Sequence, residues 1–76
     1  MLLARPECGL CDEFEQDLAR FASEMPLPSV QKVDVDSDPE LARRYGLDIP
    51  VLLWDGVKVC HHRFDRGELQ RLLRVR

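Results

Sequence analysis

The stretch Cys8-Gly9-Leu10-Cys11 determines how the rest of this sequence is interpreted, because it stands where a first strand should pass into a first helix. Two cysteines at this spacing lie one helical turn apart on one face, close enough to form a disulfide without unfolding the backbone. The unpaired N–H groups and the positive end of the helix dipole at this position favour thiolate over thiol. Because thiolate attacks disulfides, the spacing indicates thiol–disulfide exchange.

The segments on either side of this motif predict a strand and a helix. Leu2–Ala4 is a short apolar run that ends at Arg5-Pro6, as expected for a strand followed by a loop. After the motif, apolar residues recur at steps of three and four positions until Pro26, which predicts an amphipathic helix. The stripe that we expect to face the core consists of Leu10, Phe14, Leu18, Phe21 and Met25.

The middle of the sequence predicts a second strand and a short second helix. Residues 29–35 alternate, with Val33 and Val35 expected on the same side of a strand. Asp38 followed by Pro39 has the form of a helix cap and a first helical residue. Gly46 is a typical helix terminator, so we expect the second helix to end there.

The last third of the sequence predicts a hairpin and a final helix. An apolar run at residues 49–54 and an alternating run at residues 57–60 flank Asp55-Gly56, a dipeptide that accepts positive φ at both positions of a tight turn. Asp65 has the form of a helix cap, with a glutamate three positions later as in a capping box. The buried face of the helix is marked by Leu69, Leu72 and Leu73.

The resulting order is β-α-β-α-β-β-α, in a chain of 76 residues that we interpret as one α/β domain, residues 1–76. The first β-α-β unit predicts a parallel strand pair joined by a right-handed crossover. The hairpin adds antiparallel strands. We therefore expect a four-stranded mixed sheet flanked by three helices, with helices on both faces.

The composition argues against several classes of protein. The net charge is −3 and charges of both signs are interspersed, so nucleic acid is not an expected partner. The longest mostly apolar run is far shorter than the roughly 20 residues that span a bilayer, and the first residues lack a signal-peptide pattern. Three cysteines, of which two have motif spacing, favour the reducing cytoplasm and a redox-active or metal-binding pair.

The order of elements resembles the thioredoxin superfold, with Cys8-Gly-Leu-Cys11 after the first strand and Ile49-Pro50 at the third. The size and the short N-terminus look like glutaredoxins. More closely, the chain is similar to a group of small bacterial glutaredoxin-like proteins. The resemblance covers essentially the whole length and also depends on the Asp-Gly hairpin that precedes a capped terminal helix.

The resemblance implies thiol–disulfide oxidoreductase activity and assigns roles to four residues. Cys8 would be the exposed nucleophile, and Cys11 the less exposed resolving thiol. Pro50 would be the cis-proline that packs beside the disulfide and presents the backbone of Ile49 to an extended substrate. The implied substrates are protein or small-molecule disulfides, and a monomer is expected.

Charged residues near the motif are expected to tune the reactivity of Cys8. Arg5, three residues upstream, would add positive potential that helps to keep Cys8 ionised, whereas Asp12 and Glu13 act in the opposite direction. We count Arg5, with Ile49 and Pro50, among the expected substrate-binding residues.

Glutathione is the reductant that the resemblance suggests, with a reductase as the alternative and no tightly bound cofactor. The sequence departs from glutaredoxins here, because the Gly-Gly pair that helps to seat glutathione is absent. Arg63-Phe64-Asp65-Arg66 stands in its place. Of these residues, Asp65 is the candidate contact for the glutathione amino group.

Two other functions remain as alternatives to thiol–disulfide exchange for a chain of this fold. The cysteines could bind metal, either as a zinc site with Cys60, His61 or His62 or as an iron–sulfur cluster shared between two protomers. Adjacent strand residues point to opposite faces, so we do not expect His61 and His62 to converge on one ion. We expect them instead to be a surface pair, and Cys60 to be a small buried or edge residue, with a regulatory thiol as the alternative. The remaining function is a non-catalytic interaction domain.

Overall fold

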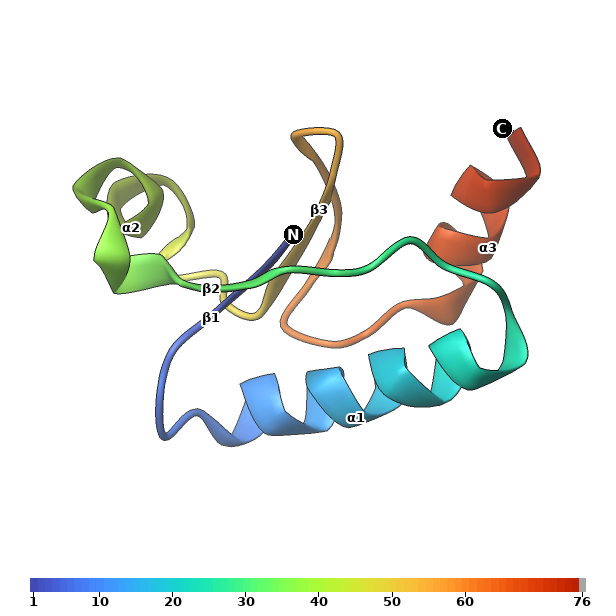
Figure 1. The fold of residues 1–76 in the computed structure, drawn as a ribbon. Coiled ribbons are helices and arrows are strands. Elements are labelled where there is room, and N and C mark those ends of the chain that lie inside the picture. Colours follow the sequence, from blue (N-terminus) through green and yellow to red (C-terminus); the bar gives the residue numbers. More distant parts are fainter. Residues whose placement is uncertain (76) are drawn as a thin grey trace.

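The computed structural model describes residues 1–75 and shows the predicted order of elements (Figure 1). These are β1 (Leu2–Ala4), α1 (Gly9–Glu24), β2 (Lys32–Asp34), the 3₁₀ turn η1 (Val35–Ser37), α2 (Pro39–Tyr45), β3 (Val51–Trp54), β4 (Val57–His61) and α3 (Arg66–Val75). The caps predicted for α2 are present, because Asp38 accepts a hydrogen bond from the N–H of Glu40 and Pro39 is the first helical residue.

The four strands form one mixed sheet in the order β2-β1-β3-β4, which confirms the predicted architecture. β1 pairs with β2 in parallel, with Leu3 opposite Val33, and α1 provides the long connection that a parallel pair requires. β3 is antiparallel to both β1 and β4. At the hairpin, Asp55 and Gly56 have φ of 50° and 80°, as the Asp-Gly turn predicted.

Two apolar clusters lie on opposite faces of this sheet. On one face, α1 and α3 pack against Leu2 and Leu52, and this cluster contains Phe14, Leu18, Phe21, Cys60 and Leu69. On the other face, residues of α2 pack against Leu3 and Val51. The switch of face between Leu2 and Leu3 follows from strand alternation, and it explains why β1 is buried on both sides.

The structure corrects two details of the predicted elements. The second strand occupies only residues 32–34 of the predicted 29–35, because Val35 turns into η1 and Asp34 caps that turn through the N–H of Asp36. Leu10, assigned to the core stripe of α1, is 41% exposed. It lies in the first turn of the helix, where it borders an open hollow with His62 instead of packing on the sheet.

Gly46 ends α2 as predicted, but not through the left-handed conformation that is common at helix ends. Its φ is −57°, and its N–H donates to the carbonyl of Ala42. A Cβ atom at this position would run into that same carbonyl oxygen. The glycine is therefore required by a close backbone approach.

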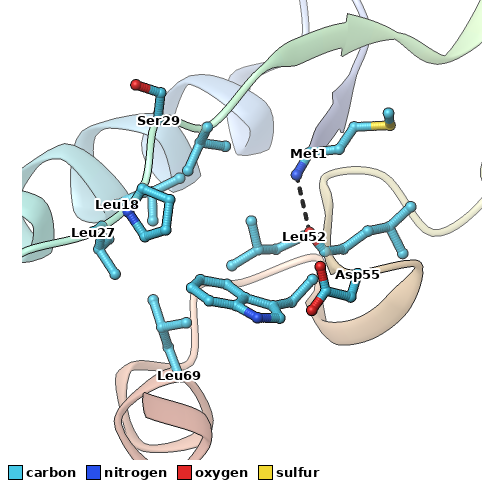
Figure 2. A pocket seen from close by; sticks show the side chains of 11 residues that line it. Met1, Leu18, Leu27, Ser29, Leu52, Asp55 and Leu69 are labelled. Carbon is cyan, nitrogen blue, oxygen red and sulfur yellow. Dashed lines mark hydrogen bonds between the residues drawn. The ribbon is translucent and has the colours of Figure 1, made fainter. Parts of the chain in front are cut away.

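An apolar hollow of 260 Å³ lies at the start of β1, the end of that strand away from Cys8 (Figure 2). Leu27 and Leu69 border it, and the backbone nitrogen of Met1 donates to the carbonyl of Leu53 beside it. Within residues 1–75, no helix combines the length and the apolar character needed to cross a membrane.

Candidate active site

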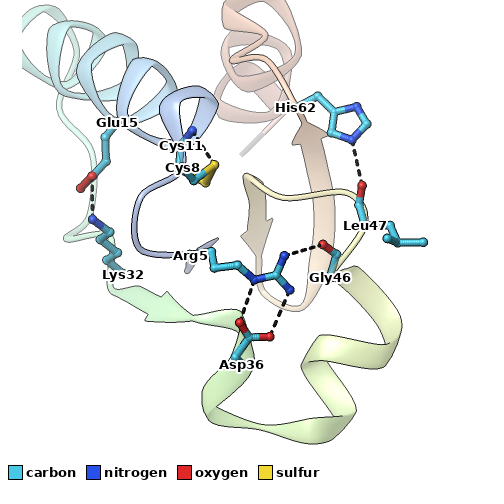
Figure 3. Close-up of a disulfide and its surroundings, with 9 residues drawn as sticks. All are labelled: Arg5, Cys8, Cys11, Glu15, Lys32, Asp36, Gly46, Leu47 and His62. Carbon is cyan, nitrogen blue, oxygen red and sulfur yellow. Dashed lines mark hydrogen bonds and ion pairs between the residues drawn. A yellow bond between two sulfur atoms is a disulfide. The ribbon is translucent and has the colours of Figure 1, made fainter.

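The two cysteines of the motif lie at the N-terminus of α1 and form a disulfide, with their Cα atoms 5.1 Å apart (Figure 3). Cys8 is the N-cap residue with an extended backbone, and Glu7 before it has a φ of 58° that turns the chain from β1 into the helix. Cys11 lies in the first turn and is only 1% exposed, whereas Cys8 is partly exposed. The two sulfur atoms are therefore in unequal environments.

The backbone of the first helical turn solvates the sulfur of Cys8. The N–H of Cys11 donates a hydrogen bond to Cys8 Sγ over 3.1 Å. This N–H is one of those that have no partner within a helix, so a sulfur atom at the N-cap takes the place of the usual capping oxygen. Such a donor stabilises a negatively charged sulfur more than a neutral one, as does the helix dipole.

Arg5 is held by an ion pair instead of facing the motif as a free charge. Its guanidinium binds the carboxylate of Asp36 through two hydrogen bonds of 2.7 and 3.0 Å, and it also donates to the carbonyl of Gly46 (Figure 3). The hydrogen bond with Asp36 raises the pKa of Arg5 and lowers that of Asp36. Arg5 thus links the end of β1 to η1 and to the end of α2, and its charge is matched by a carboxylate.

Ile49 and Pro50 lie at the same end of the sheet as the motif. Leu3 and Val51 are antiparallel partners, so the residues before Val51 lie beside the residues that leave β1 toward Cys8. The Ile49-Pro50 peptide bond is cis, as the resemblance implied. Pro50 is buried, and its carbonyl accepts a hydrogen bond of 2.8 Å from the N–H of His62.

Asp65 caps α3, since its carboxylate accepts the N–H of Glu68 over 3.1 Å. It borders a surface hollow with Cys60 and Arg66, and neither Cys8 nor Cys11 lines that hollow. The structure therefore supports the predicted cap, and Asp65 lies in a hollow that neither cysteine of the motif lines.

The hollow next to the motif is lined by residues of α1 and of the segment after β4. It measures 390 Å³ and lies between Leu10, the second residue between the cysteines, and His62. Its other lining residues are Glu13, Phe14, Gln16, Asp17, Arg63 and Phe64. We call it the motif hollow. The sequence did not predict that Leu10 lines this hollow, because its helical spacing assigned it to the core.

The two histidines are a surface pair as predicted, but they converge, contrary to the expectation from strand alternation. His61 ends β4, and His62 follows with a φ of 64°, which breaks the alternation of side chains. The two rings are 4.7 Å apart, and Asp48 lies with them. Asp48 was not predicted to lie beside the histidines, because no sequence pattern links a carboxylate at position 48 to residues 61 and 62.

Cys60 is buried, in agreement with its expected structural role. It is 8% exposed and belongs to the cluster between the sheet and α1. Burial raises the pKa of its thiol. The third cysteine is therefore shielded from solvent and holds its proton more firmly than a free thiol, whereas Cys8 is partly exposed.

Comparisons with known proteins agree with this geometry. The family model of the Glutaredoxin-like domain (DUF836) matches residues 1–74. The X-ray structure of the Northeast Structural Genomics target protein XcR50 from X. campestris is similar to this chain, with a TM-score of 0.75 and 29% sequence identity. The similarity covers 99% of this chain and 95% of that one. No curated protein sequence matches this chain.

Proposed function

The chain belongs to the glutaredoxin-like domain (DUF836) family, and on this basis we propose that it is a thiol–disulfide oxidoreductase with Cys8 and Cys11 as its redox pair. Its substrates in this proposal are disulfides of proteins or small molecules. Glutathione, or alternatively a reductase, supplies the electrons. We also propose that the protein acts as a monomer in the cytoplasm, without a tightly bound cofactor.

The unequal environments of the two sulfur atoms carry this proposal. Cys8 is partly exposed and accepts the N–H of Cys11, whereas Cys11 is almost fully buried. A nucleophile must be reachable and must be stabilised as thiolate, and Cys8 meets both conditions. A resolving thiol needs only to reach the first sulfur, and the existing disulfide satisfies that condition for Cys11.

The reaction follows from these positions in two exchanges. The Cys8 thiolate attacks one sulfur of a substrate disulfide, the substrate S–S bond breaks, and the leaving thiolate takes a proton from solvent. Cys11 then loses its proton and attacks Cys8 Sγ, which releases the second substrate thiol and forms the Cys8–Cys11 disulfide. The substrate gains two electrons. Two thiols such as glutathione restore the reduced pair and become a disulfide themselves.

The substrate would lie against the end of the sheet and the motif hollow. Ile49 is half-buried just before β3, and in this proposal its backbone pairs with an extended substrate segment. Pro50 has no N–H of its own, so it offers the substrate no backbone donor, and its carbonyl already accepts from His62. Arg5 would act by holding the loop before Cys8, and Asp65 would meet an amino group of a substrate that extends past Phe64.

The decisive experiment combines a redox titration with turnover. The protein is equilibrated at defined ratios of reduced and oxidised glutathione, free thiols are trapped by alkylation, and the products are weighed by mass spectrometry. Wild type should convert between dithiol and intramolecular disulfide, and Cys11→Ser should accumulate a glutathione adduct on Cys8. In a separate assay, wild type should reduce insulin or a small mixed disulfide.

The matched control is the buried third cysteine. Cys60→Ala should retain turnover, whereas Cys8→Ser should abolish it, although both variants remove one thiol. Equal turnover by Cys8→Ser and wild type would refute the proposed function. Stoichiometric metal in protein purified under reducing conditions, lost in Cys8→Ser, would instead support a metal-binding function of the same pair.

A further inference from the structure

A second group of ligand atoms lies at the end of β4, separate from the two cysteines. Asp48, His61 and His62 each offer one ligand atom, and these atoms all lie within 4.8 Å of one another. We call these three residues the histidine cluster. Both histidines are exposed, and Asp48 is half-buried. The sequence contains no other histidine. The proposed thiol–disulfide exchange assigns no chemical step to these side chains, although His62 lines the motif hollow.

The sheet register brings the histidine cluster together. His61 pairs with Val51 across β3 and β4, and because the strands are antiparallel the residues after His61 lie beside those that precede Val51. The N–H of His62 donates to the carbonyl of Pro50, which fixes the backbone at this crossing. The positive φ of His62 breaks the alternation of side chains at this point, and both imidazoles lie with Asp48.

The hydrogen bonding of His62 suits a metal ligand. Its Nε2 lies 3.2 Å from the carbonyl oxygen of Leu47 (Figure 3). A carbonyl can only accept, so Nε2 carries the proton and Nδ1 of the neutral ring keeps its lone pair. Metal-binding histidines usually donate their other N–H to a carbonyl or carboxylate in this way, which orients the ring.

The donor set selects the kind of ion. Two imidazole nitrogens and one carboxylate oxygen favour late first-row divalent metals such as Zn²⁺ over Ca²⁺ or Mg²⁺, which prefer oxygen ligands alone. Ligand atoms around a tetrahedral zinc ion lie about 3.4 Å apart, given bonds of about 2.1 Å. Closing the present spacing to that value requires rotations of the two exposed imidazoles and of the half-buried Asp48 side chain.

We propose that Asp48, His61 and His62 bind a late first-row divalent metal ion such as Zn²⁺. Three protein ligands leave one tetrahedral position open, as in sites that bind a water or an incoming ligand. Since His62 also lines the motif hollow, the bound ion adds positive charge next to the surface that carries Leu10. It also ties the segment before Pro50 to the end of β4.

The test is a zinc titration of the untagged, oxidised protein, in which the Cys8–Cys11 disulfide cannot bind the metal. Competition with a chromogenic chelator gives the affinity, and calorimetry gives the stoichiometry. Wild type should bind one Zn²⁺ per chain. His61→Gln, His62→Asn and the isosteric Asp48→Asn should each weaken binding at least about tenfold, in line with the sensitivity of such sites. Asparagine is chosen at position 62 because it adopts positive φ readily.

Glu24→Gln is the matched control, since it removes an exposed carboxylate at the last residue of α1 that lies outside both the histidine cluster and the motif hollow. Its affinity for Zn²⁺ should equal that of wild type, and circular dichroism should show all variants folded. The proposal is overturned if oxidised wild type binds Zn²⁺ no more tightly than His61→Gln. It is also overturned if zinc binds only after reduction of the disulfide. The first result does not bear on turnover by Cys8. The second is assigned to the cysteine pair if Cys8→Ser abolishes the binding, so failure of this proposal and failure of the proposed function are distinguishable.

Discussion

Gly46→Ala is the substitution that most directly tests how the candidate site is supported. A Cβ at Gly46 would overlap the carbonyl oxygen of Ala42 and approach the guanidinium of Arg5. Because the Ala42 atom belongs to the backbone, the last turn of α2 has to shift to make room. The carbonyl of Gly46 that accepts from Arg5 would move with it. Overpacking of this kind costs about 1–3 kcal/mol.

Gly9→Ala makes the same chemical change at a place with free space. Apart from its own helix and chain neighbours, no described atom lies within 4 Å of a Cβ at Gly9, which is the first residue of α1. Alanine there lowers the entropy of the unfolded chain and favours the helix, a gain of about 0.4–1 kcal/mol. One added methyl group should therefore destabilise at position 46 and stabilise at position 9, a difference of about 1.5–4 kcal/mol.

Urea denaturation of the oxidised proteins measures both effects, with circular dichroism as the signal. Gly46→Ala should lower the transition midpoint and Gly9→Ala should raise it, with unchanged slopes. A Gly46→Ala variant as stable as wild type would refute the close approach at the end of α2. Equal destabilisation by both variants would show that glycine is needed for chain flexibility in general, and not for space at one site.

Three further predictions concern the core, an ion pair and the third cysteine. Phe21→Leu should lower the unfolding free energy by about 1–2 kcal/mol, because Phe21 is fully buried and contacts Phe64. Val57→Ala, at an exposed position, should change it by less than about 0.5 kcal/mol. Equal effects of the two variants in urea denaturation would contradict this packing. Because Arg5 lowers the pKa of Asp36, their pair should stabilise the fold above about pH 4 and lose this effect as the pH falls through the folded-state pKa. The unfolding free energy of Asp36→Asn should therefore fall less steeply with decreasing pH than that of wild type, and equal slopes would contradict the pair. Cys60 should resist iodoacetamide in the folded, reduced protein and react in urea; alkylation as fast as at Cys8 would disprove its shielding.

The topology could be predicted because each of its signals is local. Cys8 and Cys11 marked a strand-to-helix junction, and the Asp55-Gly56 turn is favoured by its own residue types. The caps Asp38 and Asp65 bind N–H groups only two or three residues away. Rules of this kind need no knowledge of the rest of the chain, so helix and strand order followed from them.

The details that failed depend on contacts between distant segments. Leu10 has the helical spacing of a core residue, yet it lies in the first turn of α1, beside a hollow. The effect of Arg5 on Cys8 stays a prediction, but its partner Asp36, 31 residues later, could not be identified from the sequence. Periodicity cannot report where a sheet stops or which carboxylate reaches a guanidinium.

The histidines show how one backbone angle can redirect chemistry. Alternation on a straight strand separates His61 from His62, and this was the reason for not expecting a shared ion. A φ of 64° at His62 removes the alternation, and histidine is among the residues that tolerate this region. The sequence carried no turn dipeptide there, so the convergence with Asp48 became visible only in three dimensions.

Strand direction explains why all of these groups gather at one end of the sheet. β1 ends, β3 begins and β4 ends at that edge, because β3 is antiparallel to both of its neighbours. The loop to Cys8, the Ile49-Pro50 step and the histidines are therefore neighbours in space whatever their side chains are. Cys8 and His61 belong to neither of the two apolar clusters, so these two residues can change with little effect on the core. Variants of Cys8 and His61 should accordingly alter redox turnover and zinc affinity separately, while the urea midpoint of the reduced proteins, which have no disulfide to lose, stays nearly constant.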